Sequence, residues 1–310
     1  MDAVAVILEA PEQMSLRALA LNSPSDTDIV VDIAWSGIST GTERLLWSGK
    51  MPEFPGMGYP LVPGYESVGR VVDAGADTRG RIGEWVFVPG ANCYETARGL
   101  FGGTSSRVVL PGVRAIPVPE SLGVTGVLIA LAATAYHAIA GHRAPDLIVG
   151  HGVLGRLLAR VAIATGAPPP VVWETSSQRR GGNTGYPVAL PGADQRRDYK
   201  AIYDASGHGA GLDNLITRLA RGGEIVLAGF YEKPLTFAFP PAFMREARLR
   251  IASEFLPGDL TAVVALVESG ALSLDGLVTD VRPAADAAAA YPHAFTNPKC
   301  LKMALDWSAL

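Results

Sequence analysis

The chain has 310 residues, of which 48% are hydrophobic and 18% are charged, with 26 basic against 30 acidic side chains. This length suggests two domains and is sufficient to bury large cores. The formal charge of −4 argues against nucleic acid as the main partner. Two cysteines cannot build a disulfide framework or a four-cysteine zinc site. Because the first residues show no secretory signal, we expect a soluble cytoplasmic protein.

The first 120 residues predict β-structure interrupted by turns. Residues 28–33 alternate between polar and apolar positions, and residues 68–72 and 85–88 form short apolar runs. Glycines and prolines separate these runs, and long helical periodicity is missing.

Residues 121–142 contain no Asp, Glu, Lys or Arg, and this stretch is long enough to span a membrane. Its apolar residues are mostly small, and no basic cluster flanks it. We therefore predict a helix buried between two domains and no integral membrane segment.

From residue 123 onward, short hydrophobic strands alternate with helices. The strands are expected at residues 147–149, 171–173, 201–204 and 224–228. Residues 176–185 predict a polar loop in place of one helix. Such alternation is typical of parallel βαβ units with helices on both faces of the sheet. A strand at residues 249–253, a helix at 260–268 and a strand near 277–281 follow, and residues 301–307 predict a strand that returns to the first domain.

The strand at residues 147–149 leads directly into Gly150-His-Gly-Val-Leu-Gly155, which has the G-x-G-x-x-G spacing and opens an amphipathic helix with Arg156 and Arg160 polar. Gly150 permits the tight turn, Gly152 lets the backbone approach a pyrophosphate, and Gly155 allows close packing of helix and strand. The positive end of the helix attracts the phosphates. The other expected cofactor contacts are Val153, Leu154, Ser206 and Gly229.

Glu174 ends the next strand, 19 residues beyond Gly155. A carboxylate at this place accepts hydrogen bonds from the adenosine ribose and repels a 2′-phosphate, which favours NAD over NADP. Arg179 and Arg180 keep the alternative open, because guanidinium groups bind a 2′-phosphate. Since their loop has a flexible composition, we expect Glu174 to dominate and NAD to be the cofactor.

Residues 64–75 (Gly-Tyr-Glu-Ser-Val-Gly-Arg-Val-Val-Asp-Ala-Gly) resemble the G-H-E-x-x-G signature of the medium-chain dehydrogenases, the alcohol dehydrogenase superfamily. Residues 36–43 resemble the segment that supplies the catalytic cysteine of that superfamily. The resemblance covers the whole chain and implies an α/β protein. It implies a GroES-like β-rich catalytic domain at 1–125 and 256–310, and a Rossmann domain with a doubly wound parallel sheet at 126–255.

Residues 36–72 resemble one branch more narrowly, the 3-hydroxyethyl bacteriochlorophyllide a dehydrogenases of bacteriochlorophyll biosynthesis in photosynthesis. This resemblance implies oxidation of the 3-(1-hydroxyethyl) group of a chlorin macrocycle to 3-acetyl with NAD. The substrate would be a 3-hydroxyethyl bacteriochlorophyllide or chlorophyllide a. The alternatives are a zinc-free quinone reductase of the same superfamily and a non-catalytic nucleotide-binding sensor. A homodimer is compatible with the chain.

The chain departs from its zinc-dependent relatives at the metal ligands. Thr40, Tyr65 and approximately Ala130 stand where those relatives place Cys, His and a third ligand, so we expect no metal. A side chain must then relay the alcohol proton. Thr42 matches the hydroxyl that starts the family's proton relay. Tyr65 puts a phenol nearby, although a phenol with a pKa of ~10 needs a neighbouring positive charge to act as a base at neutral pH.

Thr40, Glu43 and Glu66 complete the candidate catalytic residues, and the two acids are expected to stabilise the site. His137 is expected to be a satisfied core histidine. A macrocycle also needs a wide apolar cleft with few polar anchors. The candidate cleft residues are Trp47, Phe54 and Tyr59, which occupy a region rich in Gly and Pro; the alternative for each is ordinary core packing.

Overall fold

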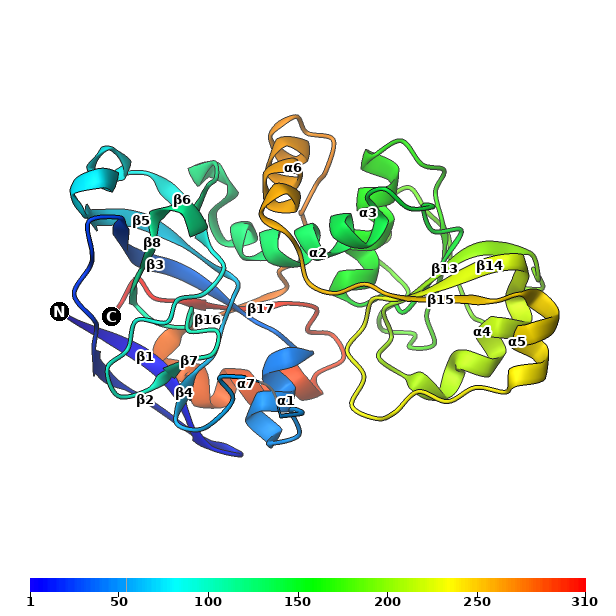
Figure 1. The fold of residues 1–310 in the computed structure, drawn as a ribbon, viewed down its shortest axis with the longest axis horizontal. Helices are drawn as coiled ribbons and strands as arrows, with labels where there is room; N and C mark the ends of the chain where they lie inside the picture. Colours follow the sequence, from blue (N-terminus) through cyan, green and yellow to red (C-terminus); the bar gives the residue numbers. More distant parts are fainter. Residues whose placement is uncertain (54) are drawn as a thin grey trace. The chain divides into compact units, whose positions relative to one another are not determined.

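The computed structural model describes residues 1–53 and 55–310, and the chain divides into two compact units (Figure 1). Unit 1 comprises Met1–Ala130 and Asp275–Leu310, and unit 2 comprises Leu131–Leu274. The chain thus returns to the first unit at Asp275, later than the position 256 expected from the sequence. The reason is that α6 (Pro257–Glu268) packs within unit 2, where Asp259 Oδ2 lies 2.8 Å from His137 Nδ1.

The strands of unit 1, as far as the structure describes them, form a four-stranded and a seven-stranded sheet. The first has the order β2-β1-β4-β7, with β1 (Asp2–Ala10), β2 (Gln13–Ala20), β4 (Leu61–Val62) and β7 (Arg98–Gly99). The second has the order β16-β17-β3-β5-β6-β9, and β8 pairs with β3. Its strands are β3 (Asp28–Ile38), β5 (Ser67–Ala74), β6 (Trp85–Val88), β8 (Arg107–Pro111), β9 (Ile116–Pro117), β16 (Asp280–Pro283) and β17 (Met303–Asp306).

Helices of unit 1 are short. They are α1 (Thr42–Ser48), α7 (Ala287–Thr296) and the 3₁₀ helices η1 (Ala76–Arg81), η2 (Gly112–Arg114), η3 (Glu120–Leu128) and η5 (Ala284–Asp286). Among them, α7 buries Ala287, Ala290, Tyr291 and Ala294 in the hydrophobic core. The helix α1 ends at Gly49, whose φ of 71° lies in the left-handed region that glycine adopts without strain. The buried residues of α1 are Glu43, Leu45 and Leu46, so its first turn carries one acidic side chain into the interior.

The strand β17 joins the C-terminal end of the chain to the centre of unit 1. It pairs antiparallel with β3, with Leu305 opposite Ser36. The indole of Trp307 is buried and donates a hydrogen bond to Ser36 Oγ at 2.9 Å. The predicted return of the final strand to the first domain is therefore confirmed.

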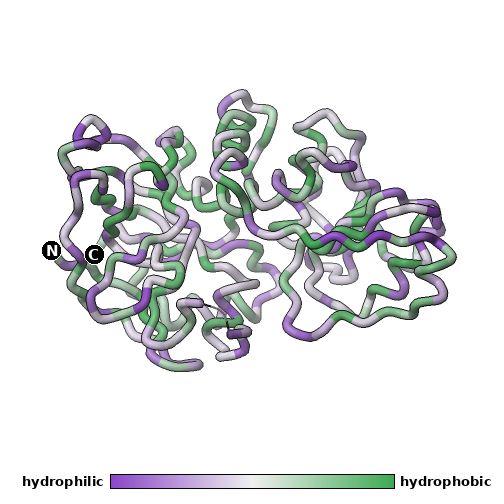
Figure 2. Tube along the Cα trace, in the orientation of Figure 1, coloured by the Kyte–Doolittle hydropathy of each residue, from purple (hydrophilic) through white to green (hydrophobic). Residues whose placement is uncertain are grey.

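Unit 2, all of whose residues are described, contains one six-stranded parallel sheet of order β12-β11-β10-β13-β14-β15. Its strands are β10 (Leu147–Val149), β11 (Val171–Trp173), β12 (Val188–Ala189), β13 (Tyr199–Asp204), β14 (Leu219–Leu227) and β15 (Arg248–Ile251). Its helices include α3 (Val153–Ala164), α4 (Leu212–Arg218), α5 (Phe239–Arg245) and the 3₁₀ helix η4 (Gly209–Gly211). Figure 2 lets the hydropathy of the chain be followed along these strands.

The order of the sheet reverses beside β10, because the chain runs from β10 outward to β11 and β12 and then resumes on the other side at β13. Ligands of open parallel sheets bind at such a reversal, beyond the carboxyl ends of the strands. The arrangement confirms the expected doubly wound α/β fold. It also places the glycine motif after β10 at the binding position.

One helical segment of the described chain, Glu120–Ile139, is long and apolar enough to cross a membrane by length and composition. It includes η3 and α2 (Ile129–Ile139), and 56% of its apolar window is buried inside the protein. Ala132, Ala133 and Ala135 have no exposed surface. Core helices of soluble proteins share these properties, so the segment is weak evidence for a membrane span.

Candidate cofactor and catalytic sites

The glycine motif forms the turn between β10 and α3. Gly150 has a φ of 97°, which only glycine adopts readily. A Cβ at Gly155 would lie 1.9 Å from the carbonyl oxygen of Gly150, so any side chain there would push the helix off the strand. A Cβ at Gly152 would meet open space. Gly152 precedes α3, and no side chain of the described residues caps its first turn, which leaves the Val153 and Leu154 end of the helix for an anion.

Glu174 lies beside this turn. Its Oε2 accepts a hydrogen bond from the backbone N–H of His151 at 3.0 Å, and its Oε1 accepts one from the N–H of Ser176 at 2.7 Å. Each carboxylate oxygen has a second lone pair, so both remain able to accept ribose hydroxyls. The carboxylate is thus fixed at the end of β11, next to the pyrophosphate position.

Ser206 and Gly229 reach the same edge of the sheet from β13 and β14. A Cβ at Gly150 would lie 3.2 Å from Ser206 Cα, which shows how closely the two turns approach. The N–H groups of Ser206 and Gly229 bond to the side chain and the carbonyl oxygen of Asp204, respectively. The structure therefore brings all the expected cofactor residues to one side of the sheet.

The loop after Glu174 makes several hydrogen bonds to the glycine turn and to α3. Arg156 was expected on the polar face of α3, yet it is 4% exposed and its guanidinium donates hydrogen bonds to loop carbonyls. The imidazole of His151 bonds to the same loop. The contacts of Arg156 and His151 with the loop could not be predicted from the sequence, because they depend on the loop folding back over α3.

In unit 1, Tyr65 and Thr42 come together at the start of α1. The Tyr65 hydroxyl lies 2.8 Å from Ser39 Oγ and also hydrogen-bonds the Thr42 side chain. Burial and the neighbouring charge of Glu66 raise the pKa of Tyr65 well above its ordinary value. The phenol therefore stays protonated at neutral pH in these surroundings, and its action as a base, which needs a neighbouring positive charge, stays a prediction.

Glu43, in the first turn of α1, is completely buried. Its Oε2 accepts a hydrogen bond from the Tyr291 hydroxyl at 2.6 Å, and its Oε1 accepts one from the Ser39 N–H at 3.1 Å. Burial raises the pKa of Glu43 to about 7, although these hydrogen bonds lower it. The protonation of Glu43 thus changes near neutral pH.

Glu66 pairs with a lysine that the sequence analysis did not identify. Lys302 Nζ lies 2.6 Å from Glu66 Oε2 and donates to the Ile38 carbonyl at 3.2 Å, and both side chains are at most 1% exposed. The other carboxylate oxygen, Oε1, is buried without a hydrogen-bond partner in the described part of the chain. The one sequence signal for Lys302 is a charge directly before the apolar residues Met303, Ala304 and Leu305 of the final strand.

The residues at the positions of the zinc ligands do not fit a zinc ion. Thr40 is half-buried and Ala130 is fully buried, so with Tyr65 they offer two hydroxyls and a methyl group. Zinc in proteins is held by thiolate, imidazole or carboxylate. Across residues 1–53 and 55–310, no group of three His, Cys, Asp or Glu residues is placed to hold a metal. We therefore assign no step to a metal.

The candidate cleft aromatics have packing contacts. Trp47 stacks at a tilt on Phe295, with ring centroids 5.7 Å apart, and the Tyr59 hydroxyl donates to the Leu46 carbonyl. Both pack against the buried cluster that contains Leu46. Phe54 lies outside the described residues. Their role in binding a macrocycle stays a prediction.

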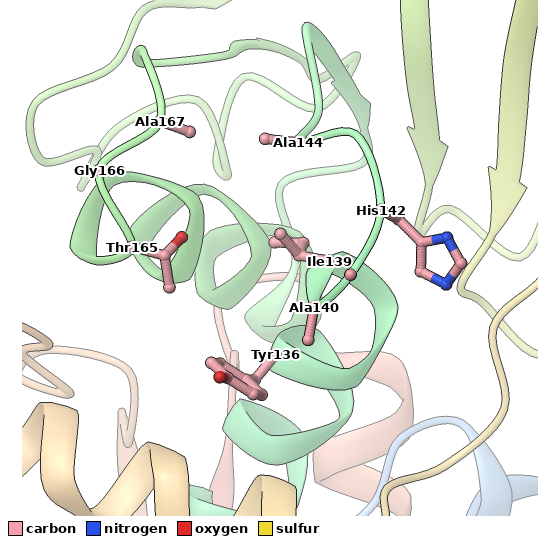
Figure 3. A pocket seen from close by; sticks show the side chains of 9 residues that line it. Tyr136, Ile139, Ala140, His142, Ala144, Thr165, Gly166 and Ala167 are labelled. Atoms are coloured by element: carbon pink, nitrogen blue, oxygen red, sulfur yellow. The ribbon is translucent and has the colours of Figure 1, made fainter.

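A separate hollow of about 390 Å³ lies in unit 2 at the C-terminal end of α3 (Figure 3). Its lining includes Tyr136, Ile139, His142 and Thr165, and the Thr165 hydroxyl is already bonded to carbonyls of α3. This is the end of α3 opposite the glycine motif. It lacks the helix N-terminus that would attract a phosphate.

Comparison with known proteins agrees with this geometry. Residues 25–120 match the alcohol dehydrogenase GroES-like domain. The chain is 58% identical to a 2-desacetyl-2-hydroxyethyl bacteriochlorophyllide A dehydrogenase of Cereibacter sphaeroides, over 100% of this chain and 99% of the relative. The chain belongs to this family. The family resemblance drawn from residues 36–72 is confirmed, and so is the assignment to the dehydrogenases.

Solved structures share the fold. A dehydrogenase from Escherichia coli in complex with NADH superposes with a TM-score of 0.84 at 21% identity, over 99% of both chains. A zinc-binding dehydrogenase homologue from Sinorhizobium meliloti bound to NADP gives 0.81 at 21% identity, again over 99% of both chains. At this identity the structural likeness establishes the fold. Because one of these structures holds NADH and the other NADP, the choice between the two cofactors must be argued from the residues of the site.

The raised pKa of Glu43 predicts a pH-dependent loss of stability. In the unfolded chain the carboxyl ionises near pH 4.5, whereas in the folded protein it stays protonated up to about pH 7. The free energy of unfolding therefore falls as the pH rises between these values, by on the order of 3 kcal/mol, and levels off above them. Glu43→Gln, which mimics the protonated acid, should lack this loss.

The measurement is urea unfolding of the unmutated protein and of Glu43→Gln between pH 4.5 and 8, with the exposed Glu268→Gln as control. The stability of Glu43→Gln relative to the unmutated protein should rise across this range, while the control should run parallel to the unmutated protein. Parallel profiles for all three would show that Glu43 is ionised in the folded state.

Proposed function

We propose that the protein works in the cytoplasm, where it oxidises the 3-(1-hydroxyethyl) group of a bacteriochlorophyllide or chlorophyllide a to 3-acetyl, with NAD as the cofactor. The observation that carries the proposal is the full-length match at 58% identity to a dehydrogenase named for this substrate. The hydroxyl cluster at Tyr65 and Thr42 supports it, because it offers proton transfer where zinc-dependent relatives place metal ligands. A quinone reductase or a non-catalytic sensor is not favoured by this match.

The glycine turn and Glu174 would hold the adenosine half of the dinucleotide. The open space at Gly152 and the uncapped start of α3 suit the pyrophosphate, and the Glu174 carboxylate suits the ribose hydroxyls. When bound, NAD accepts the hydride from the alcohol carbon. The chain itself must then remove the hydroxyl proton.

Tyr65 serves this proton transfer as a relay. Its raised pKa keeps the phenol protonated, so it can take the alcohol proton only as its own proton moves to a neighbour. Ser39 Oγ at 2.8 Å and the Thr42 hydroxyl are those neighbours. Thr42 is partly exposed, so it takes the proton from Tyr65 as it gives up its own to solvent water, which is the final acceptor. A chain of hydroxyls can pass a proton without any member holding a full negative charge in the buried site.

Removing the relay hydroxyls should lower kcat strongly and lower the melting temperature only slightly. Thr42→Val and Tyr65→Phe should each lower kcat on a 3-hydroxyethyl chlorin by ~10²–10⁴-fold, the usual effect of losing general acid–base catalysis. NAD binding should change little, because neither residue lies in unit 2. Steady-state kinetics, NAD titration and melting temperature together check the prediction.

Two structural hydroxyls provide matched controls. Tyr94 donates to the Gly102 carbonyl at 2.7 Å, and Thr78 donates to the Asp28 carbonyl at 2.7 Å. Tyr94→Phe and Thr78→Val should lose about 0.5–1.5 kcal/mol of stability and keep kcat. If Thr42→Val and Tyr65→Phe behave like these controls, their hydroxyls have only a structural role.

Glu174 should determine the preference for NAD over NADP. Glu174→Ala removes both ribose hydrogen bonds and the repulsion of a 2′-phosphate. Charge-assisted hydrogen bonds contribute ~1.5–3 kcal/mol, so the ratio of kcat/KM for NAD to that for NADP should fall roughly tenfold to a hundredfold. The exposed Glu268→Ala serves as control. Equal kcat/KM values for the two cofactors in the unmutated protein would instead assign the choice to Arg179 and Arg180.

We also propose that two copies pair through the edge of β15. Among the described residues, no strand pairs with the outer edge of β15, the last strand of the sheet of unit 2. On this strand Leu249 and Ile251 are 41% and 77% exposed. Exposed apolar edge strands are ready to pair with another chain. A two-fold axis through the middle of β15 would pair this edge antiparallel with the same edge of a second copy.

Ile251→Lys places a charge on this edge and should shift the protein from dimer to monomer. Light scattering after size exclusion measures the mass, and circular dichroism checks the fold. Ile82→Lys, at a 48% exposed position of unit 1, is the control and should stay dimeric. A monomeric unmutated protein at micromolar concentration would rule the pairing out.

A further inference from the structure

Arg156 is a buried cation that bonds exclusively to backbone carbonyls in its recorded contacts. Nε donates to the carbonyl of His151 at 3.1 Å, and Nη1 donates to that of Gly182 at 2.7 Å. Nη2 donates to the carbonyls of Gly181 at 2.7 Å and Arg179 at 3.0 Å. A guanidinium has five N–H donors in a rigid fork. One side chain thus joins the glycine turn to the segment of residues 179–182, which we term the ribose loop.

His151 makes the same connection from inside the glycine turn. Its Nδ1 lies 2.6 Å from the carbonyl oxygen of Arg179, and its Nε2 lies 2.9 Å from the Tyr186 hydroxyl. Because a carbonyl can only accept, Nδ1 carries the proton and Nε2 accepts from Tyr186. Burial lowers the pKa of His151 to about 4, so the ring is neutral at neutral pH. The Arg179 carbonyl therefore receives two hydrogen bonds from the turn.

The backbone of the ribose loop is shaped around the guanidinium. Gly182 has a φ of 73°, and a Cβ there would lie 2.6 Å from Arg156 Nη1. Gly185 has a similar φ of 76°, but the atom nearest to a Cβ there is Ile163 Cδ1 at 3.9 Å. A side chain at position 182 would thus displace the Arg156 guanidinium in addition to straining the backbone.

The geometry points to Arg156 and His151 as positioning residues that lock the ribose loop against the glycine turn and so set recognition of the adenosine ribose. The inference rests on the proposed dinucleotide site. Glu174 lies five residues before the ribose loop and accepts hydrogen bonds from the N–H groups of His151 and Ser176, while Arg156 and His151 hold the ribose loop itself. The Glu174 carboxylate and the glycine turn are thereby kept at a fixed distance from each other before the nucleotide binds. Such preorganisation raises affinity by removing the entropy of ordering the loop.

Isothermal titration calorimetry tests this lock, the hydrogen bonds of Arg156 and His151 to the ribose loop, without any catalysis. The ligands are adenosine 5′-diphosphate (ADP) and 2′,5′-adenosine diphosphate (2′,5′-ADP). Arg156→Lys keeps the charge but loses the fork. We expect its Kd for ADP to rise on the order of tenfold and its preference for ADP over 2′,5′-ADP to shrink. A residue that only stabilises the fold would lower the melting temperature and the fraction of active protein, and it would leave both Kd values unchanged.

Gly182→Ala provides a second variant that leaves Arg156 in the chain, and Gly185→Ala is its control with equal backbone strain. Gly182→Ala should weaken ADP binding and speed amide hydrogen exchange at residues 175–182, whereas Gly185→Ala should bind ADP like the unmutated protein. Unchanged Kd values in both Arg156→Lys and Gly182→Ala would overturn the lock while leaving the proposed site intact. If the unmutated protein bound neither nucleotide, the proposed site itself would fail, and the lock with it.

Discussion

The contact of α3 with the carbonyl of Gly150 is the constraint on which the cofactor half depends. A single methyl at Gly155 would approach that oxygen to 1.9 Å, so the helix can start where it does only because the side chain is absent. This packing directs the uncapped N-terminus of α3 to the reversal point of the sheet. It also brings Arg156, one residue later, within reach of the carbonyls around it.

Buried ionisable groups are stabilised in different ways in the two units. In unit 2 the cation of Arg156 is balanced by carbonyl dipoles of residues 181 and 182, without a carboxylate partner among these contacts. In unit 1 the carboxylate of Glu66 is paired with Lys302, and Glu43 avoids a buried charge by holding its proton to about pH 7. An unpaired buried carboxylate would cost several kcal/mol. The hydroxyls of Tyr65 and Thr42 thus lie in surroundings whose charges are already compensated.

The parts of the site that could be predicted from the sequence are those whose residues are close along the chain. The glycine spacing and the acid after the next strand specify a phosphate turn because β10, α3 and β11 follow one another directly. The burial of Arg156 could not be predicted, since a helical pattern cannot show that a loop 23 to 26 residues away covers a polar position. Tyr65 and Thr42 were identified by family resemblance, but the raised pKa of the phenol depends on burial that the resemblance does not encode.

Pairings between distant parts of the chain were beyond sequence reasoning. Lys302 meets Glu66 across 236 positions, and Tyr291 meets Glu43 across 248. Trp47 and Tyr59 looked exposed because Gly and Pro surround them, yet a ring contact and a hydrogen bond tie them to neighbouring elements.

The return of β17 to β3 has a consequence for biosynthesis. Unit 2 is continuous in the sequence, so its parallel sheet is fully translated by Leu274, whereas unit 1 lacks a strand of its larger sheet until Asp306 has been added. Domains fold largely as units during synthesis. The nucleotide unit can therefore complete its core on the ribosome first. Until Tyr291 and Lys302 have been added, the acids at Glu43 and Glu66 belong to a nascent chain without their partners, so this buried cluster forms after the core of unit 2 can form.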